Sequence, residues 1–174
     1  MENKLNIYII RHGEKIGGEK GLTKKGMAQV GSLTKRLGKL KITNIYSSDL
    51  LRCRETSDII KRTLKLHVKY EKALREVPSI IKENPKKHKK EIKIIKDFWN
   101  KLDKANGNIL LVSSGIVNRI LISFSLNINS SNANFMQYQT GLTRMEKVKK
   151  KKYRIWYIND TSHLSNKLKI VQQE

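Results

Sequence analysis

Cysteine and histidine are scarce in this chain of 174 residues, and that scarcity excludes disulfides and the common kinds of metal site. The single cysteine, Cys53, can form neither an internal disulfide nor a four-thiolate zinc site. The 4 histidines are scattered and lack the spacing of metal ligands. We therefore expect a protein that binds no metal and needs no cofactor.

Long apolar runs are also missing. No run approaches the roughly 18 residues that a membrane span needs. The first residues, Met1 to Lys4, lack the basic and then apolar layout of a signal peptide. We expect a soluble, cytoplasmic protein without a membrane partner, and the length predicts a single domain over residues 1–174. The oligomeric state is left open.

Acidic residues are few, with 15 Asp and Glu against 37 Lys and Arg, which gives a formal charge of +22. A surface this basic attracts polyanions. However, the abundant Lys, Ile and Asn share A/T-rich codons, so genome composition accounts for much of the excess. Aromatic residues make up only 6%, although nucleic-acid modules commonly use them for base stacking. We interpret the runs Lys86–Lys90 and Lys149–Lys152 as solvated surface and keep nucleic acid as an alternative partner.

Apolar periodicity predicts strands that alternate with helices. Strands are expected at 5–10, 42–46, 66–70 and 109–112, with an irregular stretch between Pro78 and Pro85. Helices are expected after Thr23, Asp49, Pro85 and Ser114. Segments 142–148 and 153–158 predict a late hairpin. This pattern indicates an α/β fold with a mostly parallel sheet, helices on both faces and an antiparallel hairpin near the C-terminus.

Two glycine-containing segments follow predicted strands. Arg11–Glu14 ends the first strand and Ser113–Gly115 ends the fourth. Ligands of such sheets bind beyond the carboxyl ends of the strands, so both segments face one site if the two strands are neighbours. Arg52 lies in the first turn of a predicted helix, where backbone N–H groups favour an anion. The three features together predict a phosphate site.

These residues belong to six segments whose order resembles the histidine phosphatase (phosphoglycerate mutase-like) superfamily, in its small phosphatase branch. The segments are Arg11–Glu14, Leu22–Gly26, Ser47–Arg52, Glu55–Thr56, Leu74–Glu76 and Asn159–Leu164. Together the six segments span most of the chain.

The resemblance implies a metal-independent phosphomonoesterase that acts on a small phosphorylated substrate. His12 would be the nucleophile and would form a phosphohistidine. Arg11 and Arg52 would hold the phosphate oxygens, because a guanidinium presents paired donors. Glu76 would protonate the leaving oxygen and then accept a proton from water.

The chain departs from the family pattern at two positions of this expected site. The family normally reads Val-Ser-His-Gly where this chain has Ser114 before Gly115. A hydroxyl is neutral and donates one hydrogen bond, so transition-state stabilisation is expected to fall. Lys15 replaces a common Ser or Thr and could supply positive charge to the phosphate.

Several interpretations of Ser114 stay open. The chain could be an active serine-bearing branch, a weakened or inactive relative that binds a phosphorylated ligand or polyanion, or a sequence altered by engineering. A phosphoglycerate mutase-type phosphotransferase is a further alternative, although the short segment after Glu76 favours hydrolysis.

Overall fold

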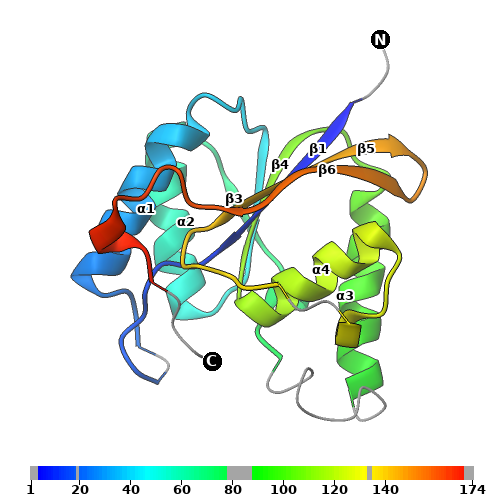
Figure 1. The fold of residues 1–174 in the computed structure, drawn as a ribbon, viewed down its shortest axis with the longest axis horizontal. Helices are drawn as coiled ribbons and strands as arrows, with labels where there is room; N and C mark the ends of the chain where they lie inside the picture. Colours follow the sequence, from blue (N-terminus) through cyan, green and yellow to red (C-terminus); the bar gives the residue numbers. More distant parts are fainter. Residues whose placement is uncertain (1–3, 19, 78–87, 133–134, 171–174) are drawn as a thin grey trace.

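A six-stranded sheet forms the centre of the protein, which this computed structural model describes over residues 4–18, 20–77, 88–132 and 135–170. The strand order is β3-β2-β4-β1-β5-β6 (Figure 1). The strands are β1 (Leu5–Arg11), β2 (Asn44–Ser47), β3 (Val68–Tyr70), β4 (Gly107–Ser113), β5 (Leu142–Lys149) and β6 (Lys152–Asp160). The first four strands run parallel, whereas β5 is antiparallel to both β1 and β6. The predicted mixed sheet and the late hairpin are confirmed.

Helices cover both faces of the sheet. On one face lie α1 (Lys24–Leu37) and α2 (Leu51–Leu64), and on the other lie α3 (Lys89–Leu102) and α4 (Gly115–Leu126) (Figure 1). Short 3-10 turns occupy Lys72–Leu74, Ser130–Asn132 and Asn166–Leu168. None of the helices in the described residues is long and apolar enough to cross a membrane. The irregular stretch predicted between Pro78 and Pro85 lies outside the described residues.

Strand β1 is buried along its whole length because both of its faces are covered. Successive side chains of a strand point to opposite faces. Leu5, Ile7 and Ile9 accordingly join the cluster that contains residues of α3 and α4. Tyr8 and Ile10 join the second cluster, which contains residues of α1 and α2. This two-sided packing explains the nearly continuous apolar run in the sequence.

The helix starts agree only partly with the prediction. Thr23 caps α1 as expected, and its hydroxyl accepts a hydrogen bond from the backbone N–H of Gly26 at 2.9 Å. The cap expected for α2 at Ser47–Asp49 is wrong in position, because the N-cap residue is Leu50, whose backbone is extended and which has no side-chain cap. The helical spacing of Met27, Val30 and Leu33 predicts one buried face; Val30 and Leu33 are buried, but Met27 is 48% exposed.

Candidate active site

The carboxyl ends of β1 and β4 lie side by side. Arg11 pairs with Ser113 in the sheet, and the backbone N–H of His12 donates to the carbonyl oxygen of Ser113 at 3.0 Å. The chain leaves β1 through α1 toward β2 and leaves β4 through α4 toward β5, on opposite sides of this strand pair. The two segments therefore meet where the connections diverge, which is the usual ligand position in open α/β sheets.

His12 is completely buried at this point. Its Nδ1 lies 2.7 Å from the carbonyl oxygen of Gly13, which can only accept, so Nδ1 carries the proton. The Nε2 atom finds no hydrogen-bond partner among the described residues. Burial lowers the pKa of His12 to about 3, and the positive charges of Arg11 and Arg52 act in the same direction. At neutral pH, His12 is thus a neutral imidazole with its lone pair on Nε2.

Positive charge surrounds this imidazole. Arg11 and Arg52 are 3% and 5% exposed, so both guanidinium groups are held inside the protein. Arg11 Nη1 donates to the carbonyl oxygen of Gln137 at 2.7 Å. Arg52 lies in the first turn of α2, as predicted. Lys15, which forms a bridge with Leu22, also lowers the pKa of His12 through its charge.

Glu76 reaches the same cluster. The guanidinium of Arg52 donates to its carboxylate, and the two groups form an ion pair. The hydroxyl of Ser113 donates to the carbonyl oxygen of Leu74 at 2.7 Å, which fixes the segment that leads to Glu76 against the end of β4. Arg52 in α2, Glu76 after β3 and Ser113 at the end of β4 are in this way brought to one place.

Ser114 and Gly115 form the N-terminus of α4. Ser114 is the N-cap residue and is 1% exposed, while Gly115 is the first residue of the helix. The Ser114 hydroxyl has no hydrogen-bond partner within the part of the chain that the structure describes. Exposed N–H groups and the helix dipole favour an anion at such a position. All seven residues predicted for the site therefore lie on the segments that meet beside β1 and β4.

Three further polar residues of this region were not predicted as site residues. Gln137 and Asn118 are buried, and the side-chain atoms of both lack partners among the described residues. Asn118 lies one helical turn after Ser114, on the same face of α4. Thr56 belongs to a motif that we noted, but its contact with the loop of His12 was not foreseen. Gln137 lies in a stretch with neither strand nor helix periodicity, so the sequence alone did not indicate that it belongs to the site.

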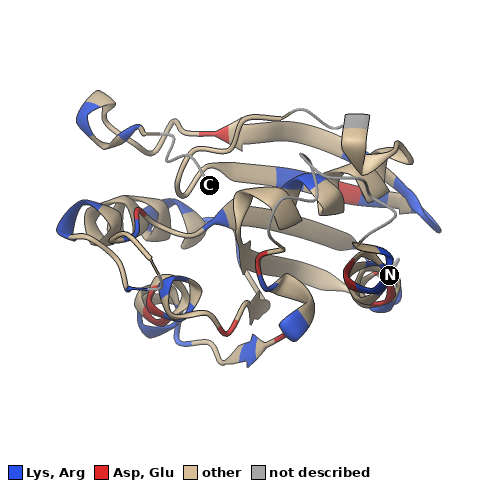
Figure 2. Cartoon of the chain, turned by 90° about the horizontal axis from the view of Figure 1, so that it is seen from below, with Lys and Arg blue, Asp and Glu red and all other residues tan. Residues whose placement is uncertain are grey.

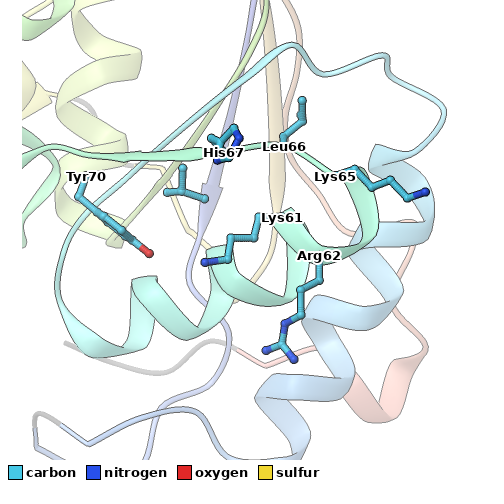
Figure 3. Close-up of a pocket in the computed structure, with 7 residues that line it drawn as sticks. Lys61, Arg62, Lys65, Leu66, His67 and Tyr70 are labelled. Atoms are coloured by element: carbon cyan, nitrogen blue, oxygen red, sulfur yellow. The ribbon is translucent and has the colours of Figure 1, made fainter.

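A separate pocket of about 420 Å³ opens at the far end of α2 (Figure 3). Lys61, Arg62, Lys65, His67 and Tyr70 are among its lining residues. Nine residues separate Arg52 from Lys61 on the helix, which corresponds to roughly 14 Å. Basic residues in a last helical turn complement the helix dipole. The carboxylate of Asp58 also pairs with Lys61 at 2.8 Å, so this cluster has a structural explanation.

No group of three or more His, Cys, Asp or Glu side chains that could hold a metal ion occurs among the described residues.

Comparison with known proteins places the chain in a family. The sequence pattern of the histidine phosphatase superfamily (branch 1) matches residues 7–93. The chain therefore belongs to this superfamily. It is 37% identical over 82 residues to the probable phosphoglycerate mutase GpmB of Escherichia coli. That match covers 42% of this chain and 38% of the relative, so the chain spans well under half of the curated protein that it matches.

Solved structures show the same fold over nearly the whole chain. A mycobacterial glucosyl-3-phosphoglycerate phosphatase is similar with a TM-score of 0.71 and 15% identity, over 90% of this chain and 99% of that one. A variant of phosphoserine phosphatase from Entamoeba histolytica, in complex with phosphoserine, is similar with a TM-score of 0.70 and 21% identity, over 92% and 99%. Phosphatases and phosphoglycerate mutase-like proteins are thus the structural neighbours of this protein.

Proposed function

We propose that this protein is a metal-independent phosphomonoesterase that works through a phosphohistidine on His12. The observation that carries this proposal is the state of His12, a buried neutral imidazole with Nδ1 engaged and its Nε2 lone pair beside two buried arginines. A neutral nitrogen nucleophile next to fixed positive charge is suited to attack on a phosphate ester.

In the first step, His12 Nε2 attacks phosphorus as the bond to the leaving alcohol oxygen breaks. Glu76, which takes up a proton from solvent when phosphate displaces it from Arg52, gives that proton to the leaving oxygen, so the alcohol leaves neutral. In the second step, water attacks the phosphohistidine, Glu76 takes a proton from the water, and the Nε2–phosphorus bond breaks. Inorganic phosphate leaves, and His12 and Glu76 return to their starting states.

Arg11 and Arg52 hold the non-bridging phosphate oxygens in this proposal. Each guanidinium offers paired donors, and both are already buried, so neither has to be brought in from solvent when phosphate binds. Arg52 forms an ion pair with Glu76 in the ligand-free protein. Phosphate would compete for the same guanidinium, and this exchange of partners would release Glu76 toward the leaving oxygen.

Ser114 and Gly115 complete the phosphate site from the N-terminus of α4. The hydroxyl and backbone N–H groups would donate to one phosphate oxygen. If Ser114 stands where the family has histidine, one positive charge is missing from the transition state, and turnover is reduced on the order of 10²- to 10³-fold. Lys15, whose charge already acts on His12, would restore part of that loss.

The substrate is proposed to be a small phosphorylated molecule. Named relatives and neighbours include a probable phosphoglycerate mutase, a glucosyl-3-phosphoglycerate phosphatase and a phosphoserine phosphatase with phosphoserine bound. A phosphate monoester that also carries a carboxylate is common to these names. The strongly basic chain, with a formal charge of +22, favours such an anion.

Phosphate release from 3-phosphoglycerate, glucosyl-3-phosphoglycerate, phosphoserine and nucleoside monophosphates tests this function. Wild-type protein should release phosphate from at least one of them in the presence of a chelator. His12→Ala should abolish release, and acid-labile protein phosphate should be trapped only in wild type. Binding of vanadate without any turnover would instead support a non-catalytic binder, and transfer between the glycerate oxygens without release would support a mutase.

A further inference from the structure

The two tryptophans of this chain have opposite environments. Trp99 is 5% exposed and packs against Tyr153 with a distance of 5.0 Å between ring centroids. Trp156, on the edge strand β6, is 52% exposed. Its indole N–H donates to a carboxylate oxygen of Glu146 at 2.9 Å, which holds the exposed ring in one position. A large aromatic ring is therefore presented to solvent in a fixed orientation.

Two arginines flank this ring. The guanidinium carbon of Arg144 lies 5.1 Å from the centre of the Trp156 ring and 5.9 Å from that of Tyr8, so it contacts both rings. The corresponding distance from Arg154 is 5.8 Å. The Arg154 side chain is 57% exposed and only 3.8 Å from Glu146, a loose ion pair. Arg144 thus lies against the indole and the buried Tyr8 ring, whereas the exposed side chain of Arg154 can turn toward a ligand.

The tip of the β5–β6 hairpin adds a dense positive charge. Lys149, Lys150, Lys151 and Lys152 are all exposed, and no ion pair is recorded for them among the described residues. From residue 144 to residue 154, the sequence holds 7 Lys and Arg and a single Glu. Lys and Arg cover this tip, at the right of the molecule (Figure 2). Charge and exposed aromatic surface thus meet on one hairpin.

This hairpin tip lies away from the candidate active site. Strand β5 runs antiparallel to β1, so that Leu142 pairs with Ile10 near the site and Glu146 pairs with Asn6. Lys149 lies seven residues beyond Leu142, at roughly 3.4 Å per residue, or about 24 Å along the strand. The cations of the tip are too far away to assist chemistry at His12, and they need a different explanation.

We propose that the outer face of the β5–β6 hairpin binds single-stranded nucleic acid, with an unpaired base stacked on Trp156 and the tip lysines on successive phosphates. Sites of this kind combine a cationic track with an exposed aromatic ring on which a base stacks. Arg154 moves from Glu146 to a phosphate when the strand binds. A double-stranded ligand keeps its bases paired and leaves the exposed indole unused.

The few apolar side chains of the hairpin favour this ligand over an anionic membrane, because its positive charge would attract either of them. Interfacial membrane segments combine cations with several apolar side chains that enter the acyl region. The hairpin tip offers only Val148, which is 51% exposed, beside its lysines. The indole N–H of Trp156, which would otherwise face the headgroups, is already bound by Glu146.

The test uses the anisotropy of a fluorescein-labelled oligo-dT of fifteen nucleotides, together with the intrinsic fluorescence of the protein. Binding should quench the emission of exposed Trp156 and leave that of buried Trp99. Trp156→Leu should remove the quenching and weaken binding at least about fivefold, the low end for loss of one stacked base. Anionic vesicles that contain phosphatidylserine serve as the competing probe.

A matched pair of charge variants separates a site from general attraction. One variant carries Lys149→Gln, Lys150→Gln and Lys152→Gln, and the control removes three charges at the α2 pocket with Lys61→Gln, Arg62→Gln and Lys65→Asn. Asparagine suits the positive φ of 54° at Lys65. The hairpin variant should bind the oligonucleotide more than tenfold more weakly. The slope of the logarithm of its binding constant against the logarithm of salt concentration should fall by about two, while the control changes little.

Equal losses in the two charge variants would overturn the proposal, because binding would then follow net charge alone. Absence of quenching in wild type, or binding of the vesicles without binding of the oligonucleotide, would overturn it as well. Thermal unfolding of each variant, followed by circular dichroism, separates lost binding from lost structure. None of these outcomes depends on phosphatase activity, so the proposed function stands or falls separately.

Discussion

The backbone N–H of Gly13 donates a hydrogen bond of 3.1 Å to the hydroxyl of Thr56, and that contact joins the loop of the candidate nucleophile to α2. The same hydroxyl donates to the carbonyl oxygen of Arg52 at 2.8 Å. One buried side chain thus links the residue after His12 to Arg52, the proposed phosphate ligand. The orientation of His12 depends on Gly13, because its Nδ1 is bound to the Gly13 carbonyl oxygen.

Thr56→Val should disturb this link while it preserves side-chain shape. The Gly13 N–H would be left buried without its partner, at a cost of about 1–3 kcal/mol in the free energy of unfolding. We expect kcat to fall by about tenfold or more with a smaller change in KM, because the nucleophile is misplaced rather than the substrate lost. Steady-state kinetics and urea unfolding measure the two effects.

Thr56→Ser is the matched control because it keeps the hydroxyl. It should recover most of the lost turnover. If valine and serine impair kcat equally, the methyl group and its packing matter instead of the hydrogen bond.

Two glycines of α1 should respond to alanine in opposite directions. A Cβ at Gly26 would collide with the backbone oxygen of Glu14, whereas a Cβ at Gly31 would meet nothing within 4 Å. Gly31→Ala should raise the free energy of unfolding by about 0.5–1 kcal/mol, because alanine is the better helix former. Gly26→Ala should lower it by about 1–3 kcal/mol through overpacking. Urea titrations followed by circular dichroism would contradict this account if both variants gained stability.

The sequence predicted the sheet and much of the site because its signals were local. The apolar run that became β1 and the segment Arg11–Glu14 can each be read without knowledge of distant residues. Their meeting with Ser113–Gly115 required one added assumption, that β1 and β4 are neighbours, and the pairing of Arg11 with Ser113 confirms it. The roles assigned to these residues stay predictions.

Features that depend on long-range packing were not predictable. Gln137 accepts from Arg11 across 126 residues, and it lies in a stretch without periodic pattern. Composition could not indicate that Trp156 is exposed, because a low aromatic content says nothing about the placement of each ring. The predicted cap of α2 at Ser47–Asp49 was wrong because residue type alone does not fix where a helix starts. That helix starts after Leu50, whose backbone is extended.

Stability should fall in mild acid because of His12. The pKa of this residue is lowered from 6.5 to about 3 in the folded protein, chiefly by burial. The unfolded chain therefore binds a proton below pH 6.5 that the folded protein does not bind, so stability is present above that pH and is lost as pH falls toward 3. Between pH 7 and pH 5, His12 alone should cost about 2 kcal/mol.

His12→Asn isolates this contribution. Between pH 7 and pH 5 the variant should lose about 2 kcal/mol less of its free energy of unfolding than wild type loses. Urea unfolding at both pH values gives the difference. Identical pH dependence in the two proteins would mean that folding does not lower the pKa of His12, so that Nε2 is protonated in mild acid as readily as in the unfolded chain.

The strongest test of the proposed chemistry concerns Ser114. If this position lacks only a cationic donor, Ser114→His should raise kcat by about tenfold or more, in the lower part of the range for one interaction with developing charge. The change in KM should be smaller, because the added charge acts most where charge develops in the transition state. Phosphate release on the best substrate of the screen measures both constants.

Ser114→Asn provides the neutral control, with a polar side chain that cannot carry charge. It should leave kcat near the wild-type value if charge, rather than bulk, is what the site lacks. Because Ser114 is buried, a larger side chain must displace its surroundings, and thermal unfolding of both variants checks that the fold survives. A Ser114→His protein that is folded, binds vanadate and turns over no faster would mean that another group already supplies the charge. Lys15, which acts on His12 electrostatically, is the nearest candidate, and Lys15→Ala should then abolish most of the activity of the wild-type pocket.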